Sequence, residues 1–285
     1  MRLATLRKPT GTVAVRLDGA FAVEIPEAAD VGAVLRTPGW RMRAMKAKGP
    51  IHGLFDLDPE MWAPVIPRPG KIVCVGLNYR NHILEMGREL PEYPTLFAKY
   101  PEALIGPYDP IVLPAAAPGA VDWEGELAVV VGRTVRAASE QAAAAAIAGY
   151  SIINDVTMRD YQYRSPEWFQ GKTFESTAPF GPALVTTDEF EPGGVLRTEV
   201  NHEVVQSAAT DGLVFSPAAL VAYISTIVTL QPGDVIATGT PGGVGHARKP
   251  PRYLAPGDRL TTSVEGIGRI ENTVRMEADD GGADG

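Results

Sequence analysis

Residues 122–131 read Asp-Trp-Glu-Gly-Glu-Leu-Ala-Val-Val-Val, and this stretch decides how the rest of the chain is interpreted. Its apolar end, residues 127–131, predicts a strand because aliphatic and β-branched side chains favour a pleated, buried surface. Further strands are predicted at residues 183–186, 195–200, 235–238 and 259–264. Turn sequences of the Pro-Gly-Asp type precede two of these strands, at residues 231–234 and 255–258.

Two segments outward from this strand carry helix signals. Residues 139–148 are rich in alanine, and Gly149 is expected to close that helix. Ser216 and Pro217 supply an N-cap and a first-turn proline to a helix that runs to about Val228. A doubly wound parallel sheet needs a helix between successive strands, and this sequence predicts too few helices for that. The predicted fold class is therefore α+β and mainly β, with a mixed or antiparallel sandwich, barrel or roll.

The N-terminal region predicts a small β-rich domain. Residues 3–6, 12–17 and 20–25 alternate between apolar and polar side chains, and Asp18-Gly19 is placed as a hairpin turn. Prolines stiffen the chain just before the apolar strand at residues 71–75. We therefore predict an N-terminal domain at residues 1–65, a catalytic domain at 66–276 and a disordered tail at 277–285.

Composition narrows the classes of partner. The chain has 285 residues, of which 45% are hydrophobic and 21% charged, so it can bury one large core or two smaller ones. A net charge of −8 opposes the attraction to phosphate that drives nucleic-acid binding, so we expect no nucleic-acid partner. No apolar run approaches the roughly 20 residues that a membrane helix needs, and we expect a cytoplasmic protein. The single cysteine, Cys74, is expected to be a small hydrophobe in a buried strand.

Three carboxylates are candidate metal ligands. Glu124 and Glu126 are two apart on the expected strand, so both point to one face. A shared cation explains this pairing, although a solvated edge strand would show the same pattern. Asp155 is a third carboxylate at the end of Ser-Ile-Ile-Asn-Asp (151–155), where a short apolar run ends in two polar residues, or else it caps a turn. Without a neighbouring His or Cys cluster, such a site suits Mg²⁺, Mn²⁺ or Ca²⁺ better than Zn²⁺.

His82 and Glu85 are neighbours if their segment is a helix, and the carboxylate can then orient the imidazole as a base. A lone histidine on a helix is, however, often incidental. Lys172 stands among turns, where it is either solvated or buried to hold an anionic group.

The segment 237–245 is a glycine-rich loop that follows a predicted strand. It can offer backbone N–H groups and the Thr240 hydroxyl to a carboxylate. It lacks the Gly-Lys-Ser/Thr ending of a phosphate-binding loop, which disfavours nucleotide binding.

These segments occur in one order along the chain: Asn-Tyr-x-x-His-x-x-Glu (78–85), Phe-x-Lys (97–99), Glu-x-Glu (124–126), Asn-Asp (154–155), Gly-Lys-x-Phe (171–174) and Thr-Gly-Thr-Pro followed by the glycine loop (238–245). The order resembles the fumarylacetoacetate hydrolase family over residues 66–275. The resemblance implies a mixed β-roll or sandwich, a homodimer, bound Mg²⁺ or Mn²⁺, and a 2-oxo acid substrate.

Residue roles carry over from the resemblance by position. It implies that the metal ligands are Glu124, Glu126 and Asp155, that the catalytic residues are His82, Glu85 and Lys172, and that the substrate-binding residues are Arg80, Gln162, Gly239 and Thr240. His82 and Glu85 would form a water-activating dyad. Glu175 and the segment 100–102 depart from the commoner pattern, which leaves the substrate identity open.

The expected reaction is cleavage of a C–C bond in an acylpyruvate such as fumarylpyruvate or acetylpyruvate, with His82 activating the water that attacks the distal carbonyl. Decarboxylation of oxaloacetate and isomerisation or tautomerisation of a 2-oxo acid would use the same residues and stay open. A non-catalytic binding protein of the same fold is the remaining alternative.

Overall fold

The computed structural model describes residues 1–80, 83 and 89–278. The largest sheet contains, in spatial order, β4 (Ile51–Gly53), β3 (Phe21–Glu24), β2 (Gly11–Asp18), β1 (Arg2–Lys8), β13 (Ala178–Thr186), β11 (Ile147–Asn154), β10 (Gly125–Val131), β16 (Val235–Ala237), β5 (Ile72–Gly76) and β6 (Thr95–Lys99), with β7 (Leu104–Ile105) paired to β13. The second sheet contains β15 (Glu203–Ala209), β14 (Val195–Val200), β17 (Arg259–Val264), β18 (Gly268–Met276) and β8 (Ile111–Leu113). A short ladder joins β9 (Val121–Asp122) to β12 (Thr157–Met158).

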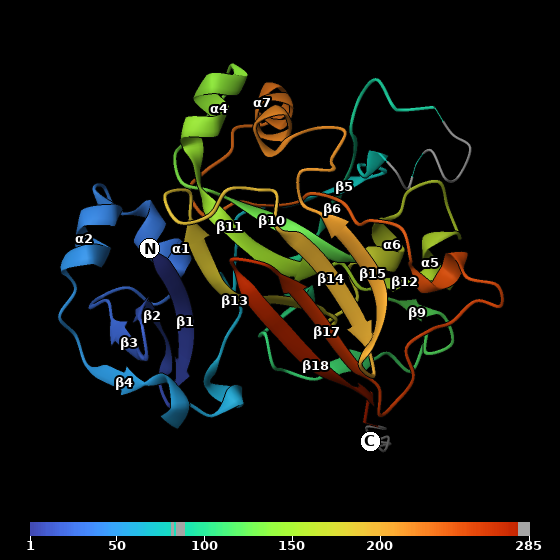
Figure 1. Cartoon of the computed structure of the whole chain (residues 1–285), viewed down its shortest axis with the longest axis horizontal. Helices are drawn as coiled ribbons and strands as arrows, with labels where there is room; N and C mark the ends of the chain where they lie inside the picture. The colour runs from blue at the N-terminus through green and yellow to red at the C-terminus, as the bar shows by residue number, and fades with distance from the viewer. Residues whose placement is uncertain (81–82, 84–88, 279–285) are drawn as a thin grey trace, which may run out of the picture.

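The described α-helices are α1 (Val31–Arg36), α2 (Trp40–Lys46), α4 (Glu140–Ala146), α5 (Arg159–Gln162), α6 (Phe169–Lys172) and α7 (Pro217–Ile227). Short 3-10 helices occupy Leu54–Asp56, Pro59–Met61, Pro101–Ala103 and Gly245–Ala247. Figure 1 shows the helices at the periphery of the two sheets, with α4 and α7 side by side above β10 and β11. The predicted α+β, mainly β fold is confirmed. No helix in the described part of the chain is long and apolar enough to cross a membrane.

Strand β10 is the centre of the core because it is covered on both faces. Leu127, Val129 and Val131 belong to a cluster that includes side chains of α4, α7 and the second sheet. Ala128 and Val130 point the other way, into a cluster that includes α1. This explains why the strand is apolar throughout instead of alternating, since neither face meets water.

The second sheet lies over the first, where β14, β17 and β18 contact β10, β11 and β13 respectively. Leu196 and Val264 of the second sheet share one apolar cluster with Ile152 and Val185 of the first. Two sheets joined by such a core form a sandwich, and apolar burial of this kind is the main source of its stability.

The two predicted helices differ in how well their ends were predicted. Helix α7 begins at Pro217 after the Ser216 cap, whose hydroxyl accepts a 3.2 Å hydrogen bond from the N–H of Ala219, as expected. Helix α4 ends at Ala146, and β11 starts at once, so the expectation that Gly149 closes this helix is wrong. Gly149 lies inside β11, where a Cβ would stand 2.1 Å from the carbonyl oxygen of Val185. The glycine therefore permits close strand approach.

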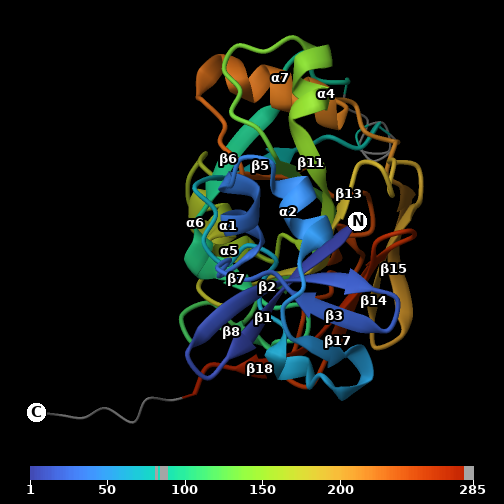
Figure 2. The same cartoon turned by 90° about the vertical axis from the view of Figure 1, so that its left-hand side faces the viewer.

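The N-terminal strands form the expected hairpins, with β2 and β3 joined across Asp18-Gly19. Strand β1 also pairs antiparallel with β13, with Arg2 opposite Val185, so these strands extend the largest sheet. Figure 2 views this N-terminal layer face-on, with α1 and α2 above β1, β2 and β3. The boundary at residues 65/66 stays a prediction, and residues 279–285 of the predicted tail lie outside the described part.

Candidate metal centre

Three buried carboxylates meet where β10 begins and β11 ends. The two strands are antiparallel neighbours with Gly125 opposite Asn154. Glu124 and Glu126 stand on either side of Gly125, and Asp155 directly follows Asn154, so the pairing brings the three acids close together. The Asp155 N–H donates to the Glu124 carbonyl oxygen (2.8 Å), and the Asn154 side chain accepts from the Glu124 N–H (2.9 Å). One carboxylate oxygen from each acid lies within 4.8 Å of the others. The structure thus brings together the three acids assigned to metal binding from the sequence.

Two lysines compensate part of this negative charge. Lys172 Nζ lies 2.5 Å from Glu124 Oε2 and 2.9 Å from Asp155 Oδ2. Lys99 Nζ lies 2.9 Å from Asp155 Oδ1 and also donates to the Lys172 carbonyl oxygen. Burial favours the neutral acid, but Lys172 and Lys99 outweigh it and hold the pKa of Asp155 below its ordinary value. Burial disfavours the Lys172 ammonium, yet Asp155 and Glu124 raise its pKa above the ordinary range, so it stays charged.

Arg159 supplies a third buried cation at the start of α5. Its guanidinium lies 2.8 Å from Glu124 Oε1 and 2.8 Å from Asp122 Oδ2, and its Nη1 donates to Gln162 Oε1 (2.8 Å). Burial opposes its charge, but Glu124 and Asp122 raise the pKa of Arg159 further. The planar guanidinium of Arg159 therefore holds Oε1 of Glu124, while Lys172 holds Oε2 of the same carboxylate.

Glu126 is the acid that most needs a cation. It is 1% exposed, and its Oε2 accepts a 2.8 Å hydrogen bond from the N–H of Gly239. Among the residues that the structure describes, it has no ion-pair partner. Burial first, and then the charges of Asp155 and Glu124, raise its pKa well above the ordinary value.

The donor set fits a hard divalent cation. With Asp122, the cluster holds four carboxyl groups against the three cations, and Glu126 is the carboxyl group that no cation faces among the described residues. Carboxylate oxygens are the ligands that Mg²⁺, Mn²⁺ and Ca²⁺ prefer, and Glu124, Glu126 and Asp155 would hold the ion.

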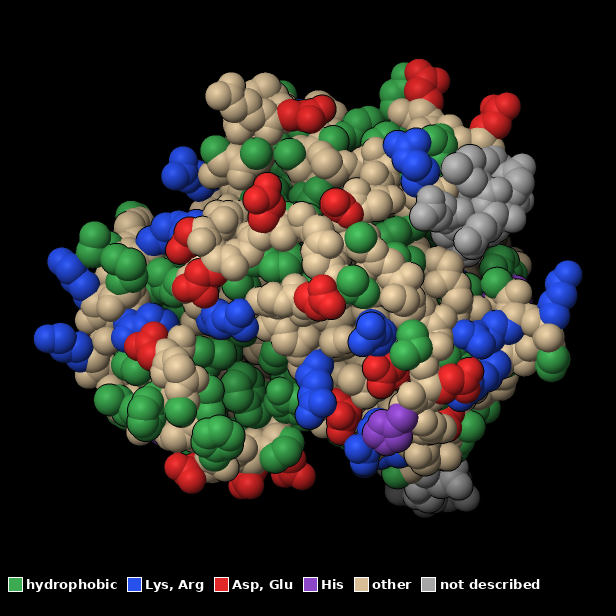
Figure 3. Space-filling view, viewed as in Figure 1, with side chains coloured by type: hydrophobic (Ala, Val, Ile, Leu, Met, Phe, Trp, Pro, Cys, Tyr) green, Lys and Arg blue, Asp and Glu red, His purple; other side chains and the backbone are tan. Residues whose placement is uncertain are grey.

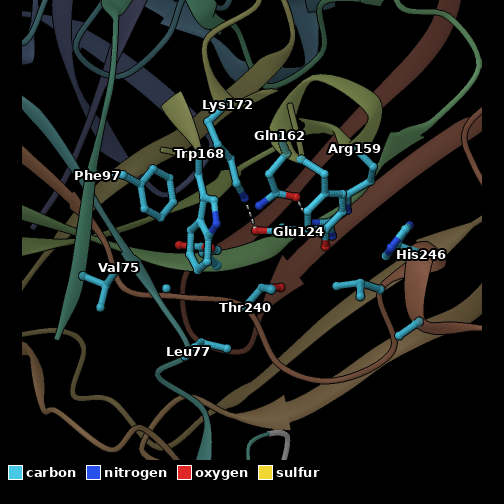
Figure 4. Close-up of a pocket in the computed structure, with 15 residues that line it drawn as sticks. Val75, Leu77, Phe97, Glu124, Arg159, Gln162, Trp168, Lys172, Thr240 and His246 are labelled. Carbon is cyan, nitrogen blue, oxygen red and sulfur yellow. Dashed lines mark hydrogen bonds and ion pairs between the residues drawn. The ribbon is translucent and has the colours of Figure 1, made fainter. Parts of the chain in front are cut away.

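A cavity of about 240 Å³ is lined at one end by Glu124 and Glu126. Figure 4 shows the Lys172 amine directed at Glu124, with Trp168 and Phe97 on one side and Thr240 and Leu77 on another. The Trp168 ring is allowed here by Gly76, because a Cβ at that position would lie 2.3 Å from the indole. The cavity therefore has a charged inner end and an aromatic wall.

The glycine loop after β16 supports the acids directly. Gly239 has a φ of 101°, and a Cβ there would lie 2.9 Å from the Val75 carbonyl oxygen, so the N–H reaches Glu126 only because this residue is glycine. The Thr240 hydroxyl donates to the Gly125 carbonyl oxygen (3.0 Å), accepts from Gln206 (2.8 Å) and lines the cavity. The loop thus positions the acids as well as lining the space beside them.

The other residues assigned from the sequence are placed differently. Gln162 is buried and lines the cavity. Arg80 is exposed and does not line it, and its N–H donates to the Gly212 carbonyl oxygen (3.2 Å). The structure therefore does not bring the Arg80 side chain to the carboxylates. His82 and Glu85 lie outside the described residues, so their dyad stays a prediction.

Several residues at this centre were not assigned from the sequence, among them Asp122, Lys99, Arg159 and Trp168. Lys99 stood in the Phe-x-Lys motif without a role, and Arg159 follows Asp155 by four residues. Their charge alone carried no signal, because most lysines and arginines are solvated.

The chain is similar to known proteins in sequence and in structure. The family model described as fumarylacetoacetate (FAA) hydrolase C-terminal matches residues 71–275. The human protein named oxaloacetate tautomerase FAHD2A, mitochondrial, is 44% identical over 236 residues, which cover 81% of this chain and 74% of the human one.

Solved structures also resemble nearly the whole chain. Fumarylacetoacetate hydrolase from Exiguobacterium antarcticum superposes with a TM-score of 0.86 at 34% identity, covering 97% of this chain and 100% of its own. The 2-hydroxyhepta-2,4-diene-1,7-dioate isomerase from Mycobacterium marinum superposes with a TM-score of 0.79 at 35% identity, covering 98% and 99%.

Proposed function

This chain belongs to the fumarylacetoacetate hydrolase family, and from that premise we propose that it is a divalent-metal-dependent enzyme that interconverts the keto and enol forms of oxaloacetate. The observation that carries the proposal is the cluster of Glu124, Glu126 and Asp155 with Lys172 and Arg159 at the inner end of a small cavity. A buried, charge-rich end of this kind suits a compact anion with several oxygen atoms.

The residues at the inner end of the cavity would have different roles in catalysis. When bound, a divalent ion would supply a Lewis acid that polarises the 2-oxo group. Lys172 and Arg159 are held charged beside Glu124 and would stabilise negative charge on the substrate oxygens. Phe97 and Trp168 form an apolar wall that limits water, which strengthens these interactions.

Tautomerisation needs only a proton transfer and no water. Going from keto to enol, a base takes the C3 proton, the C3–H electron pair forms the C2–C3 double bond, the C2=O π pair moves onto the oxygen, and that oxygen gains a proton. The base expected from the sequence is His82 oriented by Glu85. The 44% identity to a protein named oxaloacetate tautomerase supports this reaction over the other 2-oxo acid chemistries.

C–C bond hydrolysis of an acylpyruvate is the second candidate. The ordered motifs that include His82 and Glu85, and the similarity over 97% of the chain to a solved fumarylacetoacetate hydrolase, favour it. Hydrolysis differs by needing a water that attacks the distal carbonyl, so its products separate it from tautomerisation.

The test follows enol absorbance after oxaloacetate is added to the protein with MgCl₂ or MnCl₂, and again with EDTA. We expect metal-dependent interconversion with unchanged substrate mass, lost in Glu126→Gln and kept in the surface control Glu60→Gln. Release of CO₂ as the main product would replace the proposal with decarboxylation. Pyruvate plus an acid fragment from acetylpyruvate, with no effect on oxaloacetate, would replace it with hydrolysis.

We also propose a homodimer in the cytoplasm, as expected from the family and the composition. Light scattering on the purified chain checks the dimer, and fractionation of the native cell checks the location.

A further inference from the structure

His246 stands at the mouth of the cavity, on the short 3-10 helix Gly245–Ala247. The N–H groups of Gly245 and His246 donate to the two Asp122 oxygens at 2.7 and 2.9 Å. Asp122 also pairs with Arg159, so one buried carboxylate fixes both the guanidinium and the backbone that carries the imidazole. The position of His246 is therefore tied to the charged end of the cavity.

The imidazole itself is held by two tyrosines. His246 Nδ1 lies 2.8 Å from the Tyr253 hydroxyl, and the ring lies 5.2 Å from the Tyr163 ring at an angle of 34°. Burial and the Asp122 charge raise the pKa of Tyr253, and its neutral hydroxyl can donate a hydrogen bond to Nδ1 in one imidazole tautomer or accept one from Nδ1–H in the other. When Nδ1 accepts the hydrogen bond, the neutral ring carries its own hydrogen on Nε2, and a charged ring also carries a hydrogen there.

Lys172, Gln162 and His246 carry hydrogen-bond donors on this side of the cavity. Gln162 Oε1 accepts from Arg159, which leaves its amide NH₂ without a partner among the described residues. Figure 4 places Arg159 between the Lys172–Glu124 pair and His246, so donors extend from the inner end to the mouth. A substrate that reaches along this wall is matched by an oxygen-rich distal group and not by a methyl group.

We propose that His246 is a specificity-determining residue that donates its Nε2–H to the distal carboxylate of a 2-oxo dicarboxylic acid. Tyr253 and Tyr163 are positioning residues that hold the ring. The inference rests on the proposed function, because it places the 2-oxo acid end of the substrate at Glu124, Glu126 and Asp155.

The test compares oxaloacetate with 2-oxobutyrate, which carries a methyl group where oxaloacetate has its distal carboxylate. Proton exchange at C3 in deuterium oxide, followed by NMR above the uncatalysed rate, measures enolisation of both. We expect His246→Ala to lower kcat/KM for oxaloacetate by about 10- to 100-fold, mainly through KM, and to leave 2-oxobutyrate nearly unchanged. Tyr253→Phe should give a smaller loss in the same direction, and His246→Gln should restore part of it.

His52→Ala is the matched control, because His52 lies on β4 and pairs with Glu24. It should leave the preference for oxaloacetate unchanged. An equal loss on both substrates in His246→Ala, or no loss on either, overturns the inference while wild-type turnover leaves the proposed function standing.

Calorimetry with Mg²⁺ present separates the remaining cases. If the wild type turns over neither substrate but His246→Ala selectively weakens oxaloacetate binding, the proposed function fails and the inference stands. If the variant binds both ligands as the wild type does, the inference fails.

Discussion

Two clusters of paired charges in this molecule differ in burial. In the carboxylate centre, Asp155 and Lys99 have side chains that are 0% exposed, and their charged atoms lie 2.9 Å apart. At the N-terminus, the Met1 amine pairs with Glu189, and Arg41 pairs with Asp188 at 2.8 Å, but the Asp188 side chain is 59% exposed. Figure 3 shows acidic and basic side chains interspersed over one face of the protein, where such pairs meet solvent.

The difference shows where charge is costly to keep. An exposed pair contributes little because water and salt screen it. A buried pair loses its hydration free energy on folding, and the attraction between the two charges offsets only part of that loss. Removing one partner then leaves the other charge buried and unpaired, which is strongly destabilising. The buried cluster also contains an acid, Glu126, with no ion-pair partner in the described part of the chain. We infer that this arrangement is kept for binding and chemistry, whereas the N-terminal cluster is not.

The largest expected effect comes from the same substitution made in each cluster. Asp155→Asn removes one of three candidate ligands and a partner of both buried lysines, so kcat/KM should fall roughly 10³-fold. Asp188→Asn should change kcat/KM by no more than about twofold. The metal-dependent oxaloacetate assay measures both, and comparable losses would contradict the distinction between the clusters.

The second largest difference between the two clusters is expected in the free energy of unfolding. Lys99→Met leaves part of the Asp155 charge unpaired in the core, so the free energy of unfolding should fall by about 3 to 5 kcal/mol. Arg41→Met, the surface counterpart, should cost about 0 to 1 kcal/mol. Urea unfolding gives both values. The double variant Lys99→Met/Asp155→Asn should lose less than the sum of its single variants, and strict additivity would argue against coupling.

Metal binding should raise the free energy of unfolding only through the buried carboxylate cluster. Mg²⁺ at a hundred times its Kd adds about 2.7 kcal/mol to unfolding, which corresponds to a Tm rise of roughly 5 to 10 °C. Glu126→Gln should abolish this rise, whereas Glu60→Gln on the surface should retain it. Differential scanning calorimetry with and without EDTA checks the pair, and equal rises in both variants would place the ion elsewhere.

The smallest expected effect is the pH dependence of the surface cluster. The hydrogen bond with Thr186, and then that with Arg41, holds the pKa of Asp188 below its ordinary value of 3.8. A lowered carboxyl pKa contributes stability that is present above 3.8 and lost as pH falls through the folded-state value. Asp188→Asn should therefore be less stable than the wild type by less than about 1 kcal/mol at pH 6, with the difference vanishing at acid pH. Thermal unfolding across this range measures it, and a difference that grew towards low pH would contradict the sign.

Features with a local cause were predictable from residues alone. The Ser216-Pro217 start of α7 was predicted because a side-chain cap acts within three residues. The apolar run 127–131 marked β10 because its composition alone favours a strand. Gly149 was misinterpreted because a glycine near a helix end resembles a cap, and its true role depends on Val185 in another strand.

The charges around the acids could not be predicted in the same way. Lys99 comes from β6 and Arg159 from α5, and each reaches the cluster only after distant strands have paired. Arg80 was assigned by its place in a motif, yet its side chain is exposed. Position in a motif does not decide the direction of a side chain, which depends on the elements packed around it.

The amino-acid sequence by itself determined the strand-rich architecture, the order of the motifs and the three acids, because these depend on local composition and spacing. Only the tertiary structure decided that Glu124, Glu126 and Asp155 share one buried site, since that follows from the antiparallel register of β10 and β11. It also decided which cations stay buried and that His246 stands at the mouth of the cavity. The physical reason is that long-range pairing is selected by side-chain burial and strand register, which no short stretch of sequence contains.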